Sequence, residues 1–228
     1  MRFDIITIFP EIFSSYFNES ILKRAQDKKL IQIKAHNLRD FTKNKHRKVD
    51  DRPYGGGAGM VLMVEPILRA VAAIKKKKRN KVIILSPKGK QLNQKIVYDW
   101  AKKYEQLILI SGRYEGIDER AKNILRAEEI SIGPYIMTDG DVGIMAIVSS
   151  VSRLIPGVIK LESLKEESHW NLLLKKEKSS LSEALEYPHY TRPEIFTYKG
   201  KKYRAPKILL SGDHKKINEW RKEKMKSY

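Results

Sequence analysis

Short apolar runs alternate with helix-forming segments along the first 160 residues, and this alternation limits the fold more than any other feature. Runs of this length, bounded by polar or glycine-containing segments, are typical of buried strands. They occupy residues 3–8, 31–36, 82–85 and 107–110, with 128–131 as a further short candidate. Helical segments are expected from residue 10 and at residues 21–28, 65–74, 91–103, 119–125 and 142–154. The pattern predicts an α/β fold with a mostly parallel sheet and helices on both faces.

Three loops follow strands of this predicted sheet. They are Ser86-Pro87-Lys88-Gly89, the polar loop that starts at Gly112, and the segment 132–141. Because α/β sheets bind ligands at the carboxyl ends of their strands, the three loops predict one ligand site, with ordinary turns as the alternative. The sequence holds no G-x-x-x-x-G-K-[ST] loop, and the glycines at residues 55–59 lack the G-x-G-x-x-G spacing. Neither a P-loop nor a dinucleotide site is therefore predicted.

The charge of the chain points to a polyanionic partner. Lys and Arg number 46 against 27 Asp and Glu, which gives a formal net charge of +19. Nucleic acid is the simplest such partner, because cationic side chains neutralise its phosphates. The alternative is that lysine serves as general surface polarity, and the run at residues 75–78 fits that alternative as the cationic end of a helix.

Several classes of protein are excluded by composition. The absence of cysteine excludes disulfides, thiolate zinc sites and a cysteine nucleophile. No stretch approaches the roughly 18 consecutive apolar residues of a membrane span, and the first residues show no signal-peptide pattern. We therefore expect a cytoplasmic protein without a membrane partner.

The chain is expected to consist of two domains joined by a linker. A domain of residues 1–160 precedes a linker at 161–186, which is rich in Glu, Lys and Ser. A basic helical domain at 187–228 follows, in which residues 189–228 hold 12 Lys and Arg against 4 Asp and Glu. Aromatic residues lie between these cations, which is typical of an RNA-binding surface: Tyr187, Tyr190, Tyr198 and Tyr203. Residues 37–53 form a polar segment expected to be either a functional or a disordered loop.

The motifs of the chain resemble those of bacterial tRNA (guanine-N1)-methyltransferases of the SPOUT class. The resemblance is carried in order by FDIITIFPEIF, VDDRPYGGGAGM, SPKGK, SGRYEGIDER, SIGPYIMTDGD, SRLIPG and LEYPHYTRPEIF. It implies methylation of N1 of the guanine 3′ of the anticodon (position 37) in tRNA, with S-adenosylmethionine as donor. It also implies a homodimer and a SPOUT-type sheet with a C-terminal trefoil knot, whereas periodicity alone predicts an unknotted sheet.

The resemblance implies which residues contact the methyl donor. They lie in the three strand-end loops: Ser86, Pro87, Gly112, Ile132, Gly133, Pro134, Tyr135, Ile136 and Met137. Glu115 and Asp141 are acids near this pocket, and each is a candidate either for facing the sulfonium or amine of the donor or for capping a turn. A divalent metal ion is a further cofactor that the resemblance leaves open. The five histidines are scattered, so no metal ligands are assigned.

The catalytic base is where the sequence departs from the family pattern. The resemblance implies an aspartate in the linker, assisted by an arginine that matches Arg153. No aspartate occurs between Asp141 and Asp213. Glu167 is the first candidate for the base, with Glu166 and Glu177 as alternatives. Two other functions therefore stay open: a SPOUT methyltransferase that acts on another RNA, and a non-catalytic RNA-binding protein.

Overall fold

The computed structural model describes residues 1–75, 77–160 and 187–224. The chain divides into two compact units, Met1–Leu161 and Glu162–Tyr228, each of which is described by itself. The first unit contains a five-stranded sheet in the order β2-β1-β6-β5-β7, and every neighbouring pair is parallel. The strands are β1 (Arg2–Thr7), β2 (Gln32–Asn37), β5 (Asn80–Gln91), β6 (Gln106–Ile110) and β7 (Glu128–Ser131). The predicted parallel α/β sheet is confirmed.

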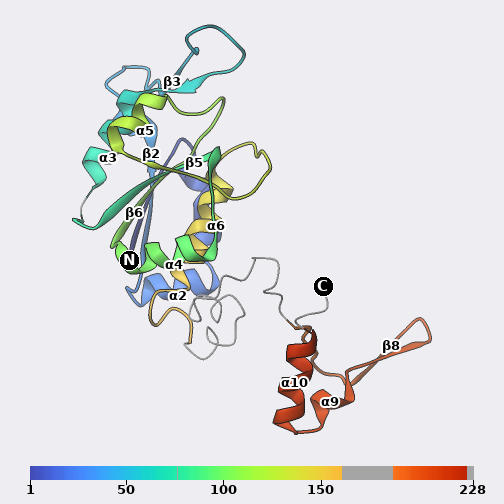
Figure 1. The fold of residues 1–228 in the computed structure, drawn as a ribbon. Helices are drawn as coiled ribbons and strands as arrows, with labels where there is room; N and C mark the ends of the chain where they lie inside the picture. Colours follow the sequence, from blue (N-terminus) through green and yellow to red (C-terminus); the bar gives the residue numbers. More distant parts are fainter. Residues whose placement is uncertain (76, 161–186, 225–228) are drawn as a thin grey trace. The chain divides into compact units, whose positions relative to one another are not determined.

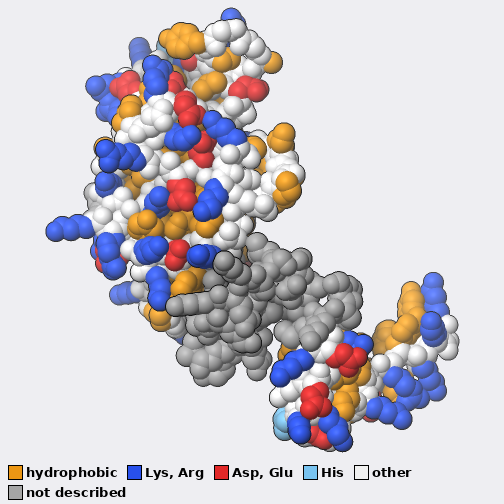
Figure 2. Space-filling model, in the orientation of Figure 1, with side chains coloured by type: hydrophobic (Ala, Val, Ile, Leu, Met, Phe, Trp, Pro, Cys, Tyr) orange, Lys and Arg blue, Asp and Glu red, His pale blue; other side chains and the backbone are white. Residues whose placement is uncertain are grey.

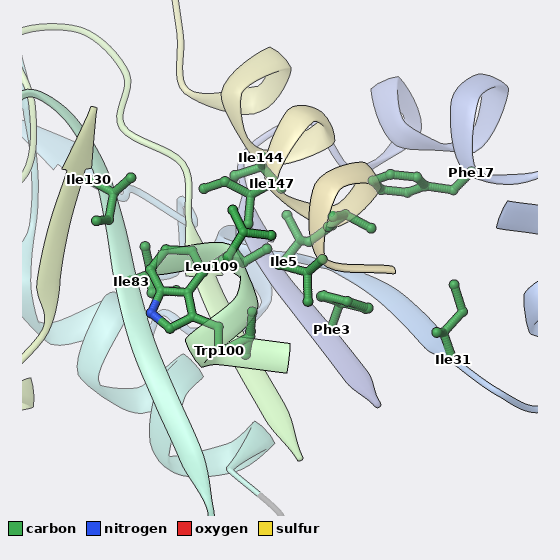
Figure 3. Packing of buried hydrophobic residues seen from close by; sticks show 14 of the residues in the cluster. Phe3, Ile5, Phe17, Ile31, Ile83, Trp100, Leu109, Ile130, Ile144 and Ile147 are labelled. Atoms are coloured by element: carbon green, nitrogen blue, oxygen red, sulfur yellow. The ribbon is translucent and has the colours of Figure 1, made fainter. Parts of the chain in front are cut away.

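Hydrophobic cores lie on both faces of the sheet, because successive side chains of each strand point to opposite faces. In β6, Leu107 and Leu109 join one core, whereas Ile108 and Ile110 join the other. The helices of this unit are η1 (Pro10–Phe13), α1 (Ser14–Phe17), α2 (Ser20–Asp27), η2 (Leu38–Phe41), α3 (Val64–Ile74), α4 (Gln94–Lys103), α5 (Glu119–Leu125) and α6 (Asp141–Ser152). The first core is closed mainly by α4 and α6; Figure 3 shows Trp100 and Ile147 beside Leu109. The second core is closed mainly by α3 and α5.

The segment at residues 37–53 is more ordered than its polar composition suggests. It contains the 3₁₀ helix η2, and Leu38 and Val49 are both buried in the second core. The strand β3 (Asp50–Asp51) pairs antiparallel with β4 (Val61–Leu62). Of the two predicted alternatives, a functional or a disordered loop, the structure does not show the disordered one, because single apolar residues without periodicity anchor the segment in the second core.

The second unit contains a β-hairpin as well as helices. The strands β8 (Ile195–Tyr198) and β9 (Lys201–Arg204) pair antiparallel, and α9 (Lys207–Leu210) and α10 (His214–Lys224) follow. The prediction of a helical unit missed this hairpin, since its short strands carry cations between their aromatic residues. Among the described residues 187–224, Ile217 is the one buried hydrophobic side chain. In the described parts of both units, no helix has the length and apolar character needed to cross a membrane.

A buried carboxylate in β1 stabilises the sheet through several hydrogen bonds. Asp4 is fully buried and accepts hydrogen bonds from Arg2 (2.6 and 2.7 Å), His36 Nε2 (2.8 Å) and Gln106 Nε2 (2.6 Å). Burial alone would raise the pKa of Asp4, but the hydrogen bonds from His36, Arg2 and Gln106 outweigh it and lower the pKa to about 2.

We expect this carboxylate to make the free energy of unfolding depend on pH. A pKa lowered in the folded state contributes stability above the unfolded pKa, and this contribution is lost as the pH falls from about 4 to about 2. Asp4→Asn should therefore lower the free energy of unfolding by about 2 kcal/mol at pH 7. Chemical denaturation at a series of pH values measures this difference, which should shrink toward pH 2. The exposed Asp99→Asn is the control, with a change below about 0.5 kcal/mol; a pH-independent difference for Asp4→Asn would contradict the prediction.

Candidate active site

A cavity of about 500 Å³ lies at the carboxyl ends of β5, β6 and β7. Three segments form its wall: residues 84–88 of β5, residues 112–119 after β6, and residues 129–132 and 135–140 in and after β7. Because the three strands are parallel neighbours, their carboxyl ends meet at one edge of the sheet. The predicted convergence of three segments at one edge is present in the structure.

The first of these segments is a bulge inside a strand and not a loop at a strand end, as the sequence suggested. Both Leu85 and Lys90 lie opposite Ile130 of β7, so the four residues between them leave the ladder. A Cβ atom on Gly89 would lie only 2.5 Å from the backbone nitrogen of Ile130. Glycine therefore permits the close approach that lets β5 rejoin β7, and the bulge directs Ser86, Pro87 and Lys88 toward the cavity.

Two glycines bring the second and third segments together. The backbone N–H of Gly140 donates a hydrogen bond of 2.9 Å to the carbonyl oxygen of Gly112. A Cβ on Gly112 would lie 2.9 Å from the carbonyl oxygen of Leu85, and one on Gly140 would lie 3.0 Å from the backbone nitrogen of Gly112. The backbones of Leu85, Gly112 and Gly140 are thus in close contact at the base of the cavity.

The structure brings most of the predicted donor-contact residues around this cavity. The lining includes Ser86, Pro87, Gly112, Ile132, Tyr135, Ile136 and Met137. Gly133 and Pro134 belong to the same turn after β7 but are not part of the lining. Ser131 fixes that turn by donating a hydrogen bond of 2.8 Å from its hydroxyl to the carbonyl oxygen of Gly133.

Arg113 connects the loops below the cavity, and sequence reasoning missed it. Its Nη2 lies 2.8 Å from Asp141 Oδ2 and 3.4 Å from Asp139 Oδ2, and its guanidinium lies 4.5 Å from the ring centre of Phe9. The other oxygen of Asp141 accepts a hydrogen bond of 2.9 Å from Thr7 Oγ1. Asp141 is fully buried and outside the cavity lining, so it holds β1, the Arg113 loop and α6 together. The only sequence signal was an arginine next to Gly112.

Glu115, the other acid considered from the sequence, does line the cavity. Its backbone N–H donates to the carbonyl oxygen of Met60 at 3.0 Å. A Cβ on Gly59 would lie 2.7 Å from Cγ of Glu115. Of the four glycines at residues 55–59, Gly59 is thus the one whose missing side chain leaves room for Glu115. Gly55 and Gly56 have no atom within 4 Å of such a Cβ, so the structure assigns them no close approach.

An ion-pair network forms the outer rim of the cavity. Glu119 Oε1 and Oε2 accept hydrogen bonds of 2.8 Å from Lys122 and Lys88 respectively, and these bonds lower the pKa of Glu119 to about 2. Lys122 also lies 2.6 Å from Glu129 Oε2. The four side chains come from β5, α5 and β7, so the network links all three segments of the rim. Among the described residues, no group of three His, Cys, Asp or Glu side chains could hold a metal ion.

Of the two predicted catalytic residues, Arg153 is not part of the cavity lining, and Glu167 lies outside the described residues. Arg153 caps the carboxyl end of α6, whereas Asp141 begins that helix beside the Arg113 loop. Arg153 follows Asp141 by twelve positions along the helix, which is roughly 18 Å at 1.5 Å per residue. Glu167, Glu166 and Glu177 lie in 161–186, outside the described residues.

The fold and the cavity together define an α/β protein with a pocket beside the ends of its parallel strands. Comparison with known proteins identifies the group more narrowly. All 228 residues match the family described as tRNA (Guanine-1)-methyltransferase TrmD, so the chain belongs to that family.

Individual relatives agree with this assignment. The chain is 52% identical to the tRNA (guanine-N(1)-)-methyltransferase of Dictyoglomus turgidum, across 98% of this chain and 84% of the relative. It is 51% identical to the enzyme of that name from Thermomicrobium roseum, across 97% and 78%. It is 47% identical to that from Clostridioides difficile, across 98% and 91%.

Proposed function

We propose that the protein is an S-adenosylmethionine-dependent methyltransferase that methylates N1 of a guanine in tRNA, namely the guanine 3′ of the anticodon (position 37). The family match over the whole chain carries this proposal. The curated relatives are named tRNA (guanine-N(1)-)-methyltransferase, at 45–52% identity. The strand-end cavity supports it independently, because its volume lies within the range of about 300–1,000 Å³ that is usual for small-molecule sites.

The cavity residues fit a donor with a cationic and an apolar part. Leu85, Ile130 and Met137 supply apolar wall, and the carboxylate of Glu115 supplies negative charge. We propose that the donor is held by Ser86, Pro87, Gly112, Ile132, Gly133, Pro134, Tyr135, Ile136 and Met137, largely through backbone groups. The glycine contacts at Gly112 and Gly140 support this role, since they bring backbone atoms to the cavity base without side chains in between. When bound, S-adenosylmethionine supplies a methyl group activated by its sulfonium.

The acceptor requires a base and a cation. N1 of guanine carries a proton at neutral pH, and removing it places negative charge on O6. A carboxylate that accepts the proton and an arginine near O6 provide the chemistry. We assign these roles to Glu167 and Arg153, with Glu166 and Glu177 as alternative bases. Glutamate carries the same carboxylate as the family's aspartate on a longer side chain. A divalent metal ion has no ligand cluster in the part of the chain that the structure describes.

Three further features belong to this proposal. Residues 1–160 form the catalytic domain, 161–186 the linker and 187–228 the tRNA-binding domain, whose net charge of +8 suits phosphate neutralisation. The protein acts as a cytoplasmic homodimer. The roughly 18 Å of α6 between Asp141, which follows the lining residue Gly140, and Arg153 supports pairing with a second copy that brings its own Arg153. The return of the chain from β7 across Gly112 to α6 is consistent with a trefoil knot.

One observation favours a second candidate function. Because the linker holds no aspartate, the protein could bind tRNA without methylating it. This alternative predicts donor-independent tRNA binding and no transfer of methyl groups.

A methyl-transfer assay on unmodified tRNA tests the proposal. We expect one N1-methylguanine, mapped to the position 3′ of the anticodon, and no incorporation into a matched transcript with adenine at that position. Methylation of another nucleotide or another RNA would favour a different SPOUT specificity. Tight tRNA binding without any transfer would favour the binding protein.

A further inference from the structure

The β8–β9 hairpin presents an aromatic face to solvent. Directly opposed residues of an antiparallel pair lie on the same face, and Phe196 pairs with Tyr203 while Tyr198 pairs with Lys201. Since alternate residues share a face, all three rings and Lys201 lie on one side of the hairpin. The rings are 49–57% exposed. The opposite side carries Ile195, Thr197, Lys202 and Arg204.

A hollow of about 410 Å³ lies next to this face. Its lining includes the aromatic residues Tyr190, Phe196 and Tyr203 and the cationic residues Arg192 and Arg204. Glu194 also contributes to the lining, so two cations face one carboxylate. The hollow therefore combines flat apolar walls with a net positive charge.

The folding of the second unit does not explain this arrangement. The one buried hydrophobic side chain among residues 187–224 is Ile217 of α10, and the hairpin residues are all exposed. Exposed apolar patches of this kind mark interaction sites in soluble proteins. Figure 2 shows the hydrophobic side chains of the hairpin beside a group of Lys and Arg side chains.

The charge of the hairpin indicates what covers the rings. Residues 195–204 hold Lys199, Lys201, Lys202 and Arg204 and no acid. Lys199 Nζ lies 5.5 Å from the ring centre of Tyr198, and Lys201 Nζ lies 5.4 Å from that of Tyr203. A second copy of the same cationic hairpin would be repelled. Duplex phosphates would satisfy the cations but leave the rings uncovered, because bases inside a helix are stacked on each other.

We propose that the aromatic face of β8–β9 and the adjacent hollow bind unpaired bases of RNA by stacking. This face is defined by Phe196, Tyr198, Tyr203 and Lys201, and the hollow by Tyr190, Arg192 and Arg204 as well. Every base offers a flat π-surface, so rings can hold single-stranded nucleotides while neighbouring cations contact the phosphates. The identification of the RNA as tRNA rests on the proposed function; stacking of unpaired bases does not.

The test measures binding of the full chain to single-stranded RNA of about 12 nucleotides, a duplex of the same length, and an unmodified tRNA transcript. Phe196→Leu combined with Tyr203→Leu keeps apolar side chains but removes two ring faces. We expect at least about tenfold weaker binding of the single strand and the tRNA, with duplex affinity unchanged. Phe196→Tyr and Tyr203→Phe should restore binding, and Ile195→Ala on the opposite side of the same hairpin is the matched control.

Salt dependence separates stacking from charge. The leucine variants should keep the parent slope of log affinity against log salt concentration, whereas Lys201→Ala, on the aromatic face, should reduce that slope by about one. Equal losses for duplex and single strand would overturn the proposal, as would unchanged affinity for all three probes. If the leucine variants instead differed from the parent in sedimentation coefficient but not in RNA affinity, the rings would form a contact between protein chains, and the proposal would also be overturned.

The methyl-transfer assay distinguishes failure of the stacking face from failure of the proposed methyltransferase activity. Methyl transfer by the parent, with unchanged RNA affinity in the leucine variants, would overturn the stacking face alone. Ring-dependent binding of single strands by a chain that transfers no methyl group would support the stacking face and overturn the proposed activity.

Discussion

Replacing Gly112 by valine should abolish S-adenosylmethionine binding while leaving the second unit unchanged. The Cβ of residue 112 would lie 2.9 Å from the carbonyl oxygen of Leu85, which is backbone and cannot rotate away. The two further methyl groups of valine must then displace either β5 or the segment that contains Gly140, whose N–H bonds to the carbonyl of Gly112. Both segments line the cavity, so either displacement changes the shape of the donor site.

Isothermal titration calorimetry with S-adenosylmethionine measures the effect, and we expect at least a hundredfold loss of affinity. Gly143→Ala is the matched control. Gly143 lies in α6 outside the cavity lining, and a Cβ there would meet only the ends of side chains: Leu85 Cδ1 at 3.1 Å, and Met137 Cε and Ile132 Cδ1 at ordinary contact distances of 3.5 and 3.6 Å. That variant should bind the donor as the parent does. Unchanged affinity in a folded Gly112→Val protein would show that the donor binds elsewhere.

The sheet was predictable because its central strands are buried on both faces. β6 is QLILI with every residue buried, and such a continuous apolar run has few alternatives to a central parallel strand. The helices were predictable for the same reason, since each must cover one of the two cores. Short elements with few apolar residues, such as β3 and the β8–β9 hairpin, lack that signal and were missed.

Much of the site depends on contacts that sequence spacing does not encode. The bulge in β5 exists because Gly89 lets two backbones touch, a condition that becomes visible only when β7 is placed beside β5. The partly buried pairing of Arg113 with Asp141 joins residues 28 positions apart. Asp141 consequently supports the loops from below, although the sequence allowed it a place beside the donor.

The donor-contact residues were inferred from the family resemblance, because hydrophobic periodicity and charge do not identify them. Residues 132–137 have no period or charge that marks them as a ligand site. Seven of the nine donor residues inferred from the resemblance nevertheless line the cavity, and six of them are not glycines: Ser86, Pro87, Ile132, Tyr135, Ile136 and Met137. The resemblance did not indicate that Arg153 and the cavity lie at opposite ends of α6. That separation follows from the length of one helix, and it makes the catalytic step the part of the proposal that most needs a kinetic test.

Replacing the linker base by its amide should slow methyl transfer by roughly 10²-fold or more, the usual scale for loss of a general base. Glu167→Gln keeps the size of the side chain and its ability to hydrogen-bond, but removes its ability to accept the proton of guanine N1. The affinities for donor and tRNA should change little, because the lost interaction belongs to the transition state. Single-turnover rates with saturating tRNA isolate this step from product release.

Glu166→Gln and Glu177→Gln are the matched controls, since each removes one carboxylate from the same 161–186 segment. If either of these slows transfer in place of Glu167→Gln, the base is reassigned to that residue. Arg153→Ala should also lower the single-turnover rate, through lost stabilisation of negative charge on O6. Parent-like rates in all three glutamine variants would exclude these glutamates as the base. Among the carboxylates that line the cavity in the described part of the chain, Glu115 is then the one to replace next, because Asp141 lies outside the lining and its carboxyl group is held by Arg113.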